Sequence, residues 1–164
     1  MADLANIYKI APDLFEVQLH RRYEASVATV WDALTTPSRM AKWFATTTYQ
    51  PIPGSPITMD FGDNDISTGT IQAFDARKLM QFTSIDANEG AETLVSFAVA
   101  QEHGLTSLIL THTRQSAWGI THTAPGWHAT LELLAAELAG EPAEWDPIWQ
   151  SVKGLYRDII RDLL

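Results

Sequence analysis

The sequence predicts an α+β fold in which a curved, six-stranded antiparallel sheet wraps around a long C-terminal helix. Apolar and polar side chains alternate over residues 14–23, as expected for a half-buried strand. Residues 57–114 then hold strand-like runs joined by short polar turns. Helical periodicity returns after residue 125. Antiparallel strands and helices therefore occupy separate parts of the chain, which is typical of α+β proteins.

Two short helices follow the first strand. Ser26 can cap the first of them, because a serine hydroxyl accepts hydrogen bonds from the free N–H groups of a helix start. The apolar residues of this helix recur at helical spacing: Val27, Val30, Trp31 and Leu34. Thr36 and Pro37 mark the start of the second helix, where proline is favoured at the first position. Its apolar face consists of Met40, Trp43 and Phe44.

The middle of the chain predicts a series of antiparallel hairpins. Residues 51–56, PIPGSP, form a loop, because prolines and glycine disfavour both helix and central strand. The strand-like runs after this loop are ITMDF, STGTIQAF, LMQFTSI, TLVSFAVA and LTSLILTHTR. Clusters of Gly, Asp, Asn or charged residues separate these runs, so each strand is expected to pair with the next.

The C-terminal third is expected to be helical. Pro125 and Gly126 open a helix, and Gly140 ends it. Its apolar face holds Trp127, Leu131, Leu134 and Leu138. A further helix covers residues 145–164, with tryptophan and tyrosine side chains along one face. We expect this face to pack back on the same chain. A homodimer interface is the alternative, because large aromatic residues are favoured in interface cores.

Composition excludes several kinds of partner. The 164 residues suit one domain, and 46% of them are apolar and 19% charged, as in a globular protein. The net charge of −9 argues against nucleic acid and against an anionic membrane surface as partners. The absence of cysteine excludes disulfides and thiolate chemistry. Neither a signal peptide nor a long apolar run is present, which predicts a cytoplasmic protein.

An ordered set of short motifs resembles one known superfamily. The motifs are RYEA at 22–25, VWDALT at 30–35, Pro37, WF at 43–44, Gly69, the strand from Thr106 to His112, and GW at 126–127 with Leu131 and Leu134. This set resembles the START-like or SRPBCC superfamily, which has the helix-grip fold of the birch pollen allergen. Within it, the chain looks most like the group named after the activator of the heat-shock-protein 90 ATPase.

The resemblance implies a division of the chain and a cavity. A helix-grip core would cover residues 14–140 of one domain that spans 1–164. Residues 1–13 would form an N-terminal extension, and 145–164 an additional helix. Such folds have a deep cavity between the sheet and the long helix, often used to hold an apolar ligand. The resemblance implies no single activity, because one fold hosts many functions.

The candidate ligand-binding residues are mainly aromatic and aliphatic side chains expected on the concave face or at its mouth. They are Met40, Trp43, Phe44, Phe61, Phe74, Phe82, Phe97, Leu110, His112, Trp118, Trp127, His128, Leu131 and Leu134. Any one of them can simply fill the core. As a group they favour a cavity of ~300–1,000 Å³, because a sheet that grips one helix is hard to close at one end. Its polar groups would come from His112, Thr111, Thr113 or Arg114.

Motifs for catalysis, nucleotides and metals are absent from the sequence. It contains no GxSxG, GxGxxG or HExxH pattern. His112, His122 and His128 lie close together, with His122 expected in a loop, but their spacing does not predict a metal site. Asp63 and Asp65 fall in a hairpin turn, where solvation explains them. The sequence therefore predicts neither a cofactor nor a metal.

Three functions remain open. The first is a binding module that encloses an apolar or amphipathic small molecule, which the aromatic residues favour. The second is an enzyme of cyclase, hydrolase or dehydratase type, with His112, His128 or Arg114 as acid, base or oxyanion partner. The third is a protein-interaction role such as cochaperone-like ATPase activation, which the group's name suggests and an acidic surface would suit.

Overall fold

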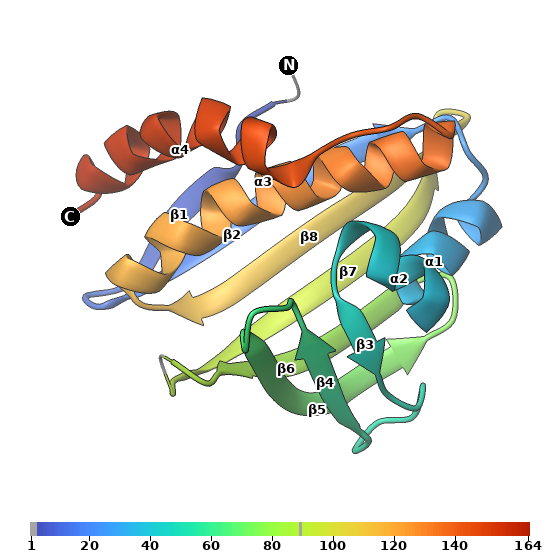
Figure 1. Cartoon of the computed structure of the whole chain (residues 1–164), viewed down its shortest axis with the longest axis horizontal. Coiled ribbons are helices and arrows are strands. Elements are labelled where there is room, and N and C mark those ends of the chain that lie inside the picture. Colours follow the sequence, from blue (N-terminus) through green and yellow to red (C-terminus); the bar gives the residue numbers. More distant parts are fainter. Residues whose placement is uncertain (1–2, 89) are drawn as a thin grey trace.

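A computed structural model describes residues 3–88 and 90–164. These residues form an eight-stranded antiparallel sheet, in the order β1-β2-β8-β7-β6-β5-β4-β3, and four helices (Figure 1). The strands are β1 (Asn6–Ala11), β2 (Leu14–Tyr23), β3 (Thr46–Thr48), β4 (Pro56–Asp60), β5 (Ile66–Asp75), β6 (Leu79–Asp86), β7 (Glu92–Glu102) and β8 (Leu105–Gln115). The helices are α1 (Val27–Thr35), α2 (Pro37–Trp43), α3 (Ala117–Ala139) and α4 (Trp145–Arg161).

The α+β class is confirmed, but the predicted count of six strands is wrong. β1 lies within the expected N-terminal extension and pairs with β2, with Ile7 opposite Val17. β3 pairs with β4, with Thr47 opposite Met59. Both strands lie at sheet edges and carry little apolar alternation, since β1 is mostly exposed and β3 consists of three threonines. Periodicity therefore did not indicate them.

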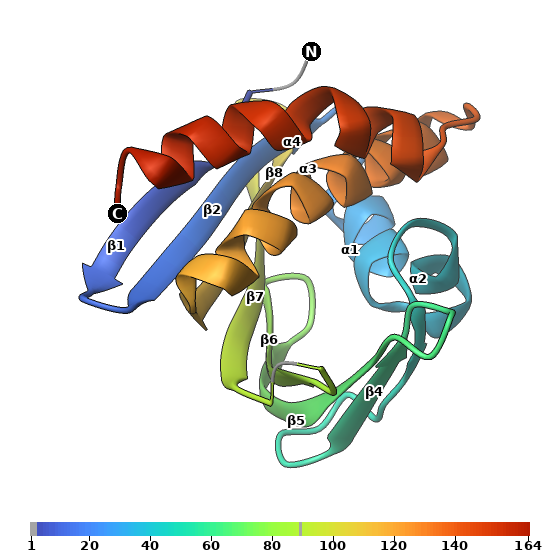
Figure 2. The same cartoon turned by 60° about the vertical axis from the view of Figure 1, so that its left-hand side comes forward.

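The sheet curls around α3, and the other helices close its two ends. Figure 2 shows α4 lying over α3 on the side of β1 and β2, while α1 and α2 lie at the opposite end of α3. The side chains on the concave face alternate along each strand, and they include Leu19, Phe82, Phe97 and Leu110, all fully buried. In the described ranges, no helix is long and apolar enough to cross a membrane.

The long helix α3 begins eight residues earlier than Pro125, where the sequence placed its start. Ser116 caps it by accepting a hydrogen bond from the backbone N–H of Gly119 at 2.9 Å. Pro125 lies inside the helix, where it removes one backbone donor. The predicted start at Pro125 is wrong because proline is favoured at the first position of a helix and is rare inside one, as it occurs here. His122 is therefore a helical residue and not part of a loop.

The last helix packs back on the same chain. α3 ends at Gly140, as predicted, in the left-handed conformation with φ of 68°. Val152, Tyr156 and Ile160 of α4 are then buried against the rest of the fold. The Tyr156 hydroxyl accepts a hydrogen bond from the Ala5 backbone N–H at 2.7 Å. This contact ties α4 to the segment that leads into β1.

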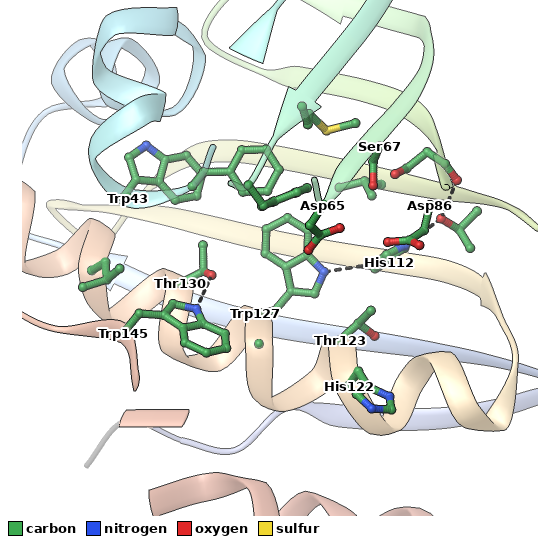
Figure 3. Close-up of a pocket in the computed structure, with 18 of the residues that line it drawn as sticks. Trp43, Asp65, Ser67, Asp86, His112, His122, Thr123, Trp127, Thr130 and Trp145 are labelled. Atoms are coloured by element: carbon green, nitrogen blue, oxygen red, sulfur yellow. Dashed lines mark hydrogen bonds between the residues drawn. The ribbon is translucent and has the colours of Figure 1, made fainter. Parts of the chain in front are cut away.

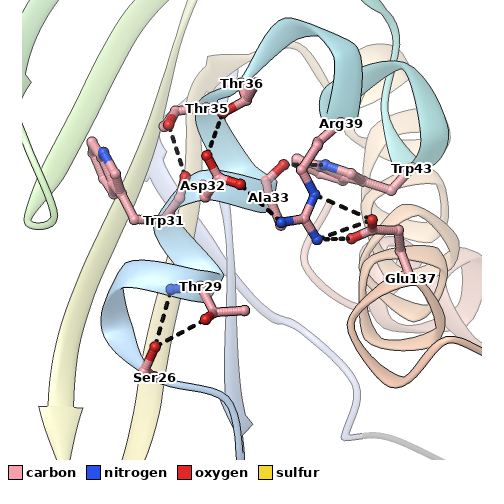
Figure 4. A network of polar contacts seen from close by, with 10 residues as sticks. All are labelled: Ser26, Thr29, Trp31, Asp32, Ala33, Thr35, Thr36, Arg39, Trp43 and Glu137. Carbon is pink, nitrogen blue, oxygen red and sulfur yellow. Dashed lines mark hydrogen bonds and ion pairs between the residues drawn. The ribbon is translucent and has the colours of Figure 1, made fainter.

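Arg39 holds α1, α2 and α3 together (Figure 4). Its guanidinium donates to Asp32 Oδ2 of α1 at 2.9 Å and to Glu137 Oε2 of α3 at 2.8 Å. A second contact supports this arrangement, because the Trp43 indole N–H donates to the Ala33 carbonyl at 2.8 Å. The Arg39–Glu137 pair fixes α2 against α3, and the Trp43–Ala33 bond fixes α2 against α1. Together they hold the aromatic side chains at the end of α2 in place.

Gly69 permits the close approach of β5 and β6. A Cβ atom at this position would lie 1.7 Å from the Thr83 carbonyl oxygen. Beside it, the Thr83 hydroxyl accepts a hydrogen bond from the Thr70 backbone N–H at 2.9 Å. Between Ile71 and Ala73 the pairing of the two strands shifts by one residue, as at a β-bulge. The sheet bends at this point, which brings β4 and β5 round toward α3.

Replacing Gly69 with alanine should destabilise the protein, because the backbone of β5 or β6 must move to accept the new methyl group. We expect Gly69→Ala to lower the free energy of unfolding by about 1–3 kcal/mol or more, measured by urea unfolding. Gly154→Ala on the exposed part of α4 is the matched control. It meets no neighbour and should stabilise the protein by about 0.5–1 kcal/mol. An unchanged midpoint for Gly69→Ala would contradict this account.

Candidate functional site

A cavity of about 820 Å³ lies between the concave face of the sheet, the end of α2, α3 and the start of α4 (Figure 3). Its aromatic lining residues are Trp43, Phe44, Phe61, Phe82, Trp127, Trp145 and Trp149. Its polar lining residues include Asp65, Ser67, Ser84, Asp86, Thr93, His112, Gln115, His122, Thr123, Thr130 and Asp146. The space is therefore apolar along one wall and polar where strands β5 to β8 and α3 face each other.

The aromatic wall is a set of rings in direct contact. Phe44 stacks on Trp127, with ring centroids 5.3 Å apart and planes at 14°. Trp43 also stacks on Phe44, with ring centroids 5.4 Å apart. Phe61 meets Phe44 edge-on at 5.3 Å and is 43% exposed, so it lies at the mouth. Such contacts keep the rings in place without a ligand.

His112 is the centre of a hydrogen-bonded chain behind this wall. Its Nδ1 accepts from the Trp127 indole N–H at 2.9 Å. Its Nε2 lies 2.7 Å from the Thr93 hydroxyl, which itself donates to the Ser84 carbonyl at 3.0 Å. The indole can only donate, so Nδ1 carries no proton and Nε2–H donates to Thr93. This series of hydrogen bonds therefore links α3 to β8, β7 and β6, and each group donates to the next one away from α3.

Burial keeps His112 neutral. The side chain is almost completely buried, and this lowers the pKa of His112 from 6.5 to about 3. Both ring nitrogens already have partners, so neither is free to take up or release a proton for a ligand. At this position the imidazole orients neighbouring groups and has no spare site for acid–base chemistry.

A bulge at the end of β8 brings Gln115 into the site. β8 contains one more residue than β2 between their paired positions, and Arg114 has a positive φ of 64° there. Gln115 donates from Nε2 to the His112 carbonyl at 3.0 Å, and its Oε1 accepts from the Thr123 hydroxyl. The bulge therefore connects the end of β8 to α3 beside the cavity, while Arg114 remains exposed.

Two carboxyl groups meet at the polar side of the cavity. Asp65 precedes β5 and Asp86 ends β6, and both line the cavity (Figure 3). Burial raises the pKa of Asp65, and the charge of Asp86 and a hydrogen bond with it act in the same direction. Like charges held this close favour a shared proton and attract a cationic or hydrogen-bond-donating group.

The start of α4 completes the wall opposite the sheet. The Trp145 indole N–H donates to the Thr130 hydroxyl of α3 at 3.1 Å. Trp145 stacks on Trp149, with centroids 5.8 Å apart, and the Lys153 ammonium lies 4.8 Å from the Trp149 ring. The aromatic stripe expected on this helix therefore lines the cavity at its N-terminal end.

The structure brings together only part of the predicted ligand-binding set. The predicted residues that line the cavity are Trp43, Phe44, Phe61, Phe82, His112 and Trp127. Those that lie outside its lining are Met40, Phe74, Phe97, Leu110, Trp118, His128, Leu131 and Leu134. Of these, Met40, Phe97 and Leu110 are fully buried core residues. These three residues lie behind the cavity lining, and the periodicity of a sequence does not predict such depth.

The remaining members of that second group have other neighbours. Phe74 packs edge-on against Trp31, with centroids 5.5 Å apart. Trp118 is 60% exposed and contacts only the His122 ring among its aromatic neighbours in the described chain. His128 is 1% exposed, and its Nδ1 lies 2.8 Å from the Tyr156 hydroxyl of α4. Leu131 and Leu134 are fully buried on α3.

Several polar groups of the site were not predicted. Thr111 and Thr113 alternate with the buried His112, so they face away from the cavity, and Thr93 and Gln115 take their place. The pair Asp65 and Asp86 was missed because the turn position of Asp65 suggested solvation. The alternation of β5 does indicate that Asp65 faces the cavity, because Asp65 lies two residues before the inward-facing Ser67. Among residues 3–88 and 90–164, no group of His, Asp and Glu side chains is arranged to hold a metal ion.

The burial of His112 makes stability depend on pH. In the folded state the pKa of His112 is about 3, and that of His128 is about 4, also through burial, against 6.5 for the ordinary side chain. The unfolded chain therefore binds more protons between pH 6.5 and pH 3. The free energy of unfolding should fall with decreasing pH in this window, by up to about 1.4 kcal/mol per pH unit for each histidine.

The variant His112→Gln tests this account. Glutamine can accept from Trp127 and donate to Thr93, but it does not titrate. We expect a lower stability at pH 7 and a shallower loss between pH 6.5 and pH 4, measured by urea unfolding at each pH. His103→Asn, in the exposed β7–β8 turn, should keep the slope of the original protein. Equal slopes for His112→Gln and the original protein would refute the assignment.

Solved structures share the fold at low sequence identity. CalU16 from Micromonospora echinospora superposes with a TM-score of 0.80 at 20% identity, covering 95% of this chain and 96% of that one. DynU16, described as a protein in the dynemicin biosynthetic locus, gives a TM-score of 0.71 at 25% identity, over 77% of this chain and 48% of that one. The Aha1 dimer from Colwellia psychrerythraea gives 0.64 at 19% identity, covering 75% and 95%.

Sequence comparison identifies the family. No protein of curated function matches the chain significantly. The family model described as "Activator of Hsp90 ATPase homolog 1-like protein" matches residues 24–139, which run from the end of β2 to the end of α3. This range includes most of the cavity lining on the sheet, α2 and α3. The chain therefore belongs to the Activator of Hsp90 ATPase homolog 1-like family.

Proposed function

We propose that this protein binds an apolar or amphipathic small molecule in the cavity between the sheet, α2, α3 and α4. The observation that carries the proposal is the aromatic wall of a cavity of about 820 Å³. This volume lies within the range of small-molecule sites, which are mostly apolar with a few well-placed polar groups. The rings are held by their own contacts, so little ordering would be needed when a ligand enters.

The hydrogen bonds of His112 favour binding over catalysis at this residue. A general base needs a free lone pair, and Nδ1 already accepts from Trp127. The other candidates from the sequence are also poorly placed, since His128 lies outside the cavity lining and Arg114 is exposed. The neutral His112 would instead hold Trp127 in position for contact with the ligand.

The distribution of the lining suggests an amphipathic ligand. Its apolar part would lie against the aromatic wall near Phe44 and Trp127. Its polar part would face Asp65, Asp86 and Gln115, which offer carboxyl and amide groups. The relative DynU16 is described as a protein of a biosynthetic locus, which fits a small organic compound as the ligand.

Native mass spectrometry of the purified protein and a thermal-shift screen test the proposal. We expect a retained or added compound that raises Tm and quenches tryptophan fluorescence. Trp145→Ala, which removes a lining residue that is 38% exposed, should weaken binding by roughly tenfold or more. Trp118→Ala is the matched control, because Trp118 is exposed and lies outside the lining. No binding by a chemically diverse library, or equal loss in both variants, would contradict the proposal.

A second candidate function, an enzyme on the same scaffold, rests on Asp65. Its pKa is raised by burial and by Asp86, which suits a general acid. The same experiment separates the two functions, because catalysis would convert the bound compound into a product detectable by mass spectrometry. Turnover that Asp65→Asn abolishes while binding is retained would favour the enzyme. Unchanged compound after prolonged incubation would favour the binding protein.

We also propose a homodimer that joins the β1 edges of two copies. β1 is a sheet edge. Its Tyr8 and Ile10 side chains are exposed apolar groups, as is Leu14 at the start of β2. A related fold is described as a dimer in Colwellia psychrerythraea. Light scattering should give twice the chain mass, and Ile10→Lys should reduce it to the chain mass. A monomer at high protein concentration would refute this interface.

A further inference from the structure

On the α4 side of α3, three buried side chains present polar atoms without partners. They are Arg21 and Tyr23 of β2 and His128 of α3, which are 9%, 8% and 1% exposed. Within the described chain, Arg21 Nε and Nη2, the Tyr23 hydroxyl and His128 Nε2 have no hydrogen-bond partner. Buried polar groups are nearly always satisfied, so a group of four such atoms requires an explanation.

Arg21 carries a buried charge that lacks a counter-ion. Its Nη1 donates to the neighbouring His20 carbonyl at 3.0 Å, but this bond does not neutralise the guanidinium. No carboxylate of the described residues lies within ion-pair distance of it. Glu132 of α3 is near enough for its charge to act on Tyr23, yet it forms no ion pair with Arg21. A buried guanidinium is strongly disfavoured unless a negative group accompanies it.

The neighbouring groups are also donors. The Tyr156 hydroxyl accepts from the Ala5 N–H, so its own proton is available for His128 Nδ1 at 2.8 Å. His128 then carries its proton on Nε2, the atom without a partner. Burial raises the pKa of the Tyr23 phenol, so it keeps its proton as well. Four unpartnered atoms can thus donate hydrogen bonds, beside one positive charge.

These groups belong to one small region. Arg21 and Tyr23 are two residues apart on β2, so their side chains leave the same face of the sheet. α3 packs on β2, and α4 packs on α3. The charge of Arg21 acts on Tyr23, His128 and Tyr156, which agrees with this proximity.

We propose that Arg21, Tyr23 and His128 form a binding site for a small monovalent anion, such as chloride or a simple carboxylate, between β2, α3 and α4. One buried positive charge matches one negative charge. A water molecule would leave the guanidinium uncompensated, and it would bring two donors of its own to a group of donors. None of the three residues lines the aromatic cavity, so this site is separate from the ligand site proposed above.

Thermal unfolding of the full chain tests the site. The protein is dialysed into sodium gluconate, whose anion is large, and sodium chloride or sodium acetate replaces it at constant ionic strength. We expect Tm to rise along a saturation curve. At an anion concentration of 100 times Kd, the folded-to-unfolded ratio increases about 100-fold, which corresponds to a Tm increase of roughly 5 °C or more. A response to both anions supports a general monoanion site, and a response to one identifies the preferred class.

Two variants and one control connect the effect to these residues. Arg21→Met should abolish the anion-dependent rise in Tm, and Tyr23→Phe should reduce it. Arg22→Met is the matched control, because Arg22 lies on the other face of β2 and pairs with Glu102 at 2.8 Å. It should keep the rise. An equal rise in Arg21→Met, or the absence of a rise in the original protein, would overturn the proposal.

A second measurement does not depend on the variants folding. Proton–nitrogen NMR spectra of the histidine side chains should show the His128 Nε2 signal moving as chloride or acetate is added, with the same half-saturation as the Tm curve. The His112 signals, on the cavity side, should stay in place. An unchanged His128 signal at saturating anion would overturn the site, whatever the outcome of the ligand screen.

Discussion

The hydrogen bond from the Trp127 indole to His112 is the contact on which the rest of the site depends. A buried indole N–H needs an acceptor, and in this fold the imidazole of the last strand supplies it at 2.9 Å. That bond determines the imidazole tautomer, and the tautomer determines that Nε2 donates to Thr93. One helix is thereby fixed against three neighbouring strands. Because Trp127 and Thr93 engage both ring nitrogens, this histidine has no free nitrogen, and its burial keeps it neutral.

The cavity lies between α3, which this contact holds against the last strands, and the part of the sheet that curves round to face it. Gly69 lets β5 and β6 approach closely where the sheet curves, and Arg39 holds the helices at the end of α3. The rings of Phe44 and Trp127 stack across the gap between α2 and α3. The contacts within this aromatic wall hold its rings together, so the proposed ligand would need to order few side chains on entering.

Among the described residues, the buried polar atoms on the two sides of α3 differ in whether they have hydrogen-bond partners. Toward the cavity, every polar atom of the His112 chain has a partner, so the chain needs nothing from outside the protein. Toward α4, Arg21 and His128 leave donors unused beside a positive charge. In native proteins another group nearly always supplies the acceptor for such buried donors. The donors left without partners beside the charge of Arg21 are the reason for proposing an anion on the α4 side.

The sequence by itself determined those elements whose cause is local. Alternation predicted β2 at its observed bounds, and Ser26 and Gly140 mark a helix start and a helix end as expected. Only the tertiary structure decided the edge strand β1, the start of α3 ahead of Pro125, and the members of the site. Asp65 precedes β5 whereas Asp86 ends β6, and Phe97 and Phe82 share a face although only Phe82 reaches the cavity. Periodicity reports which face a side chain occupies, whereas depth and neighbours across strands depend on how the sheet bends and pairs.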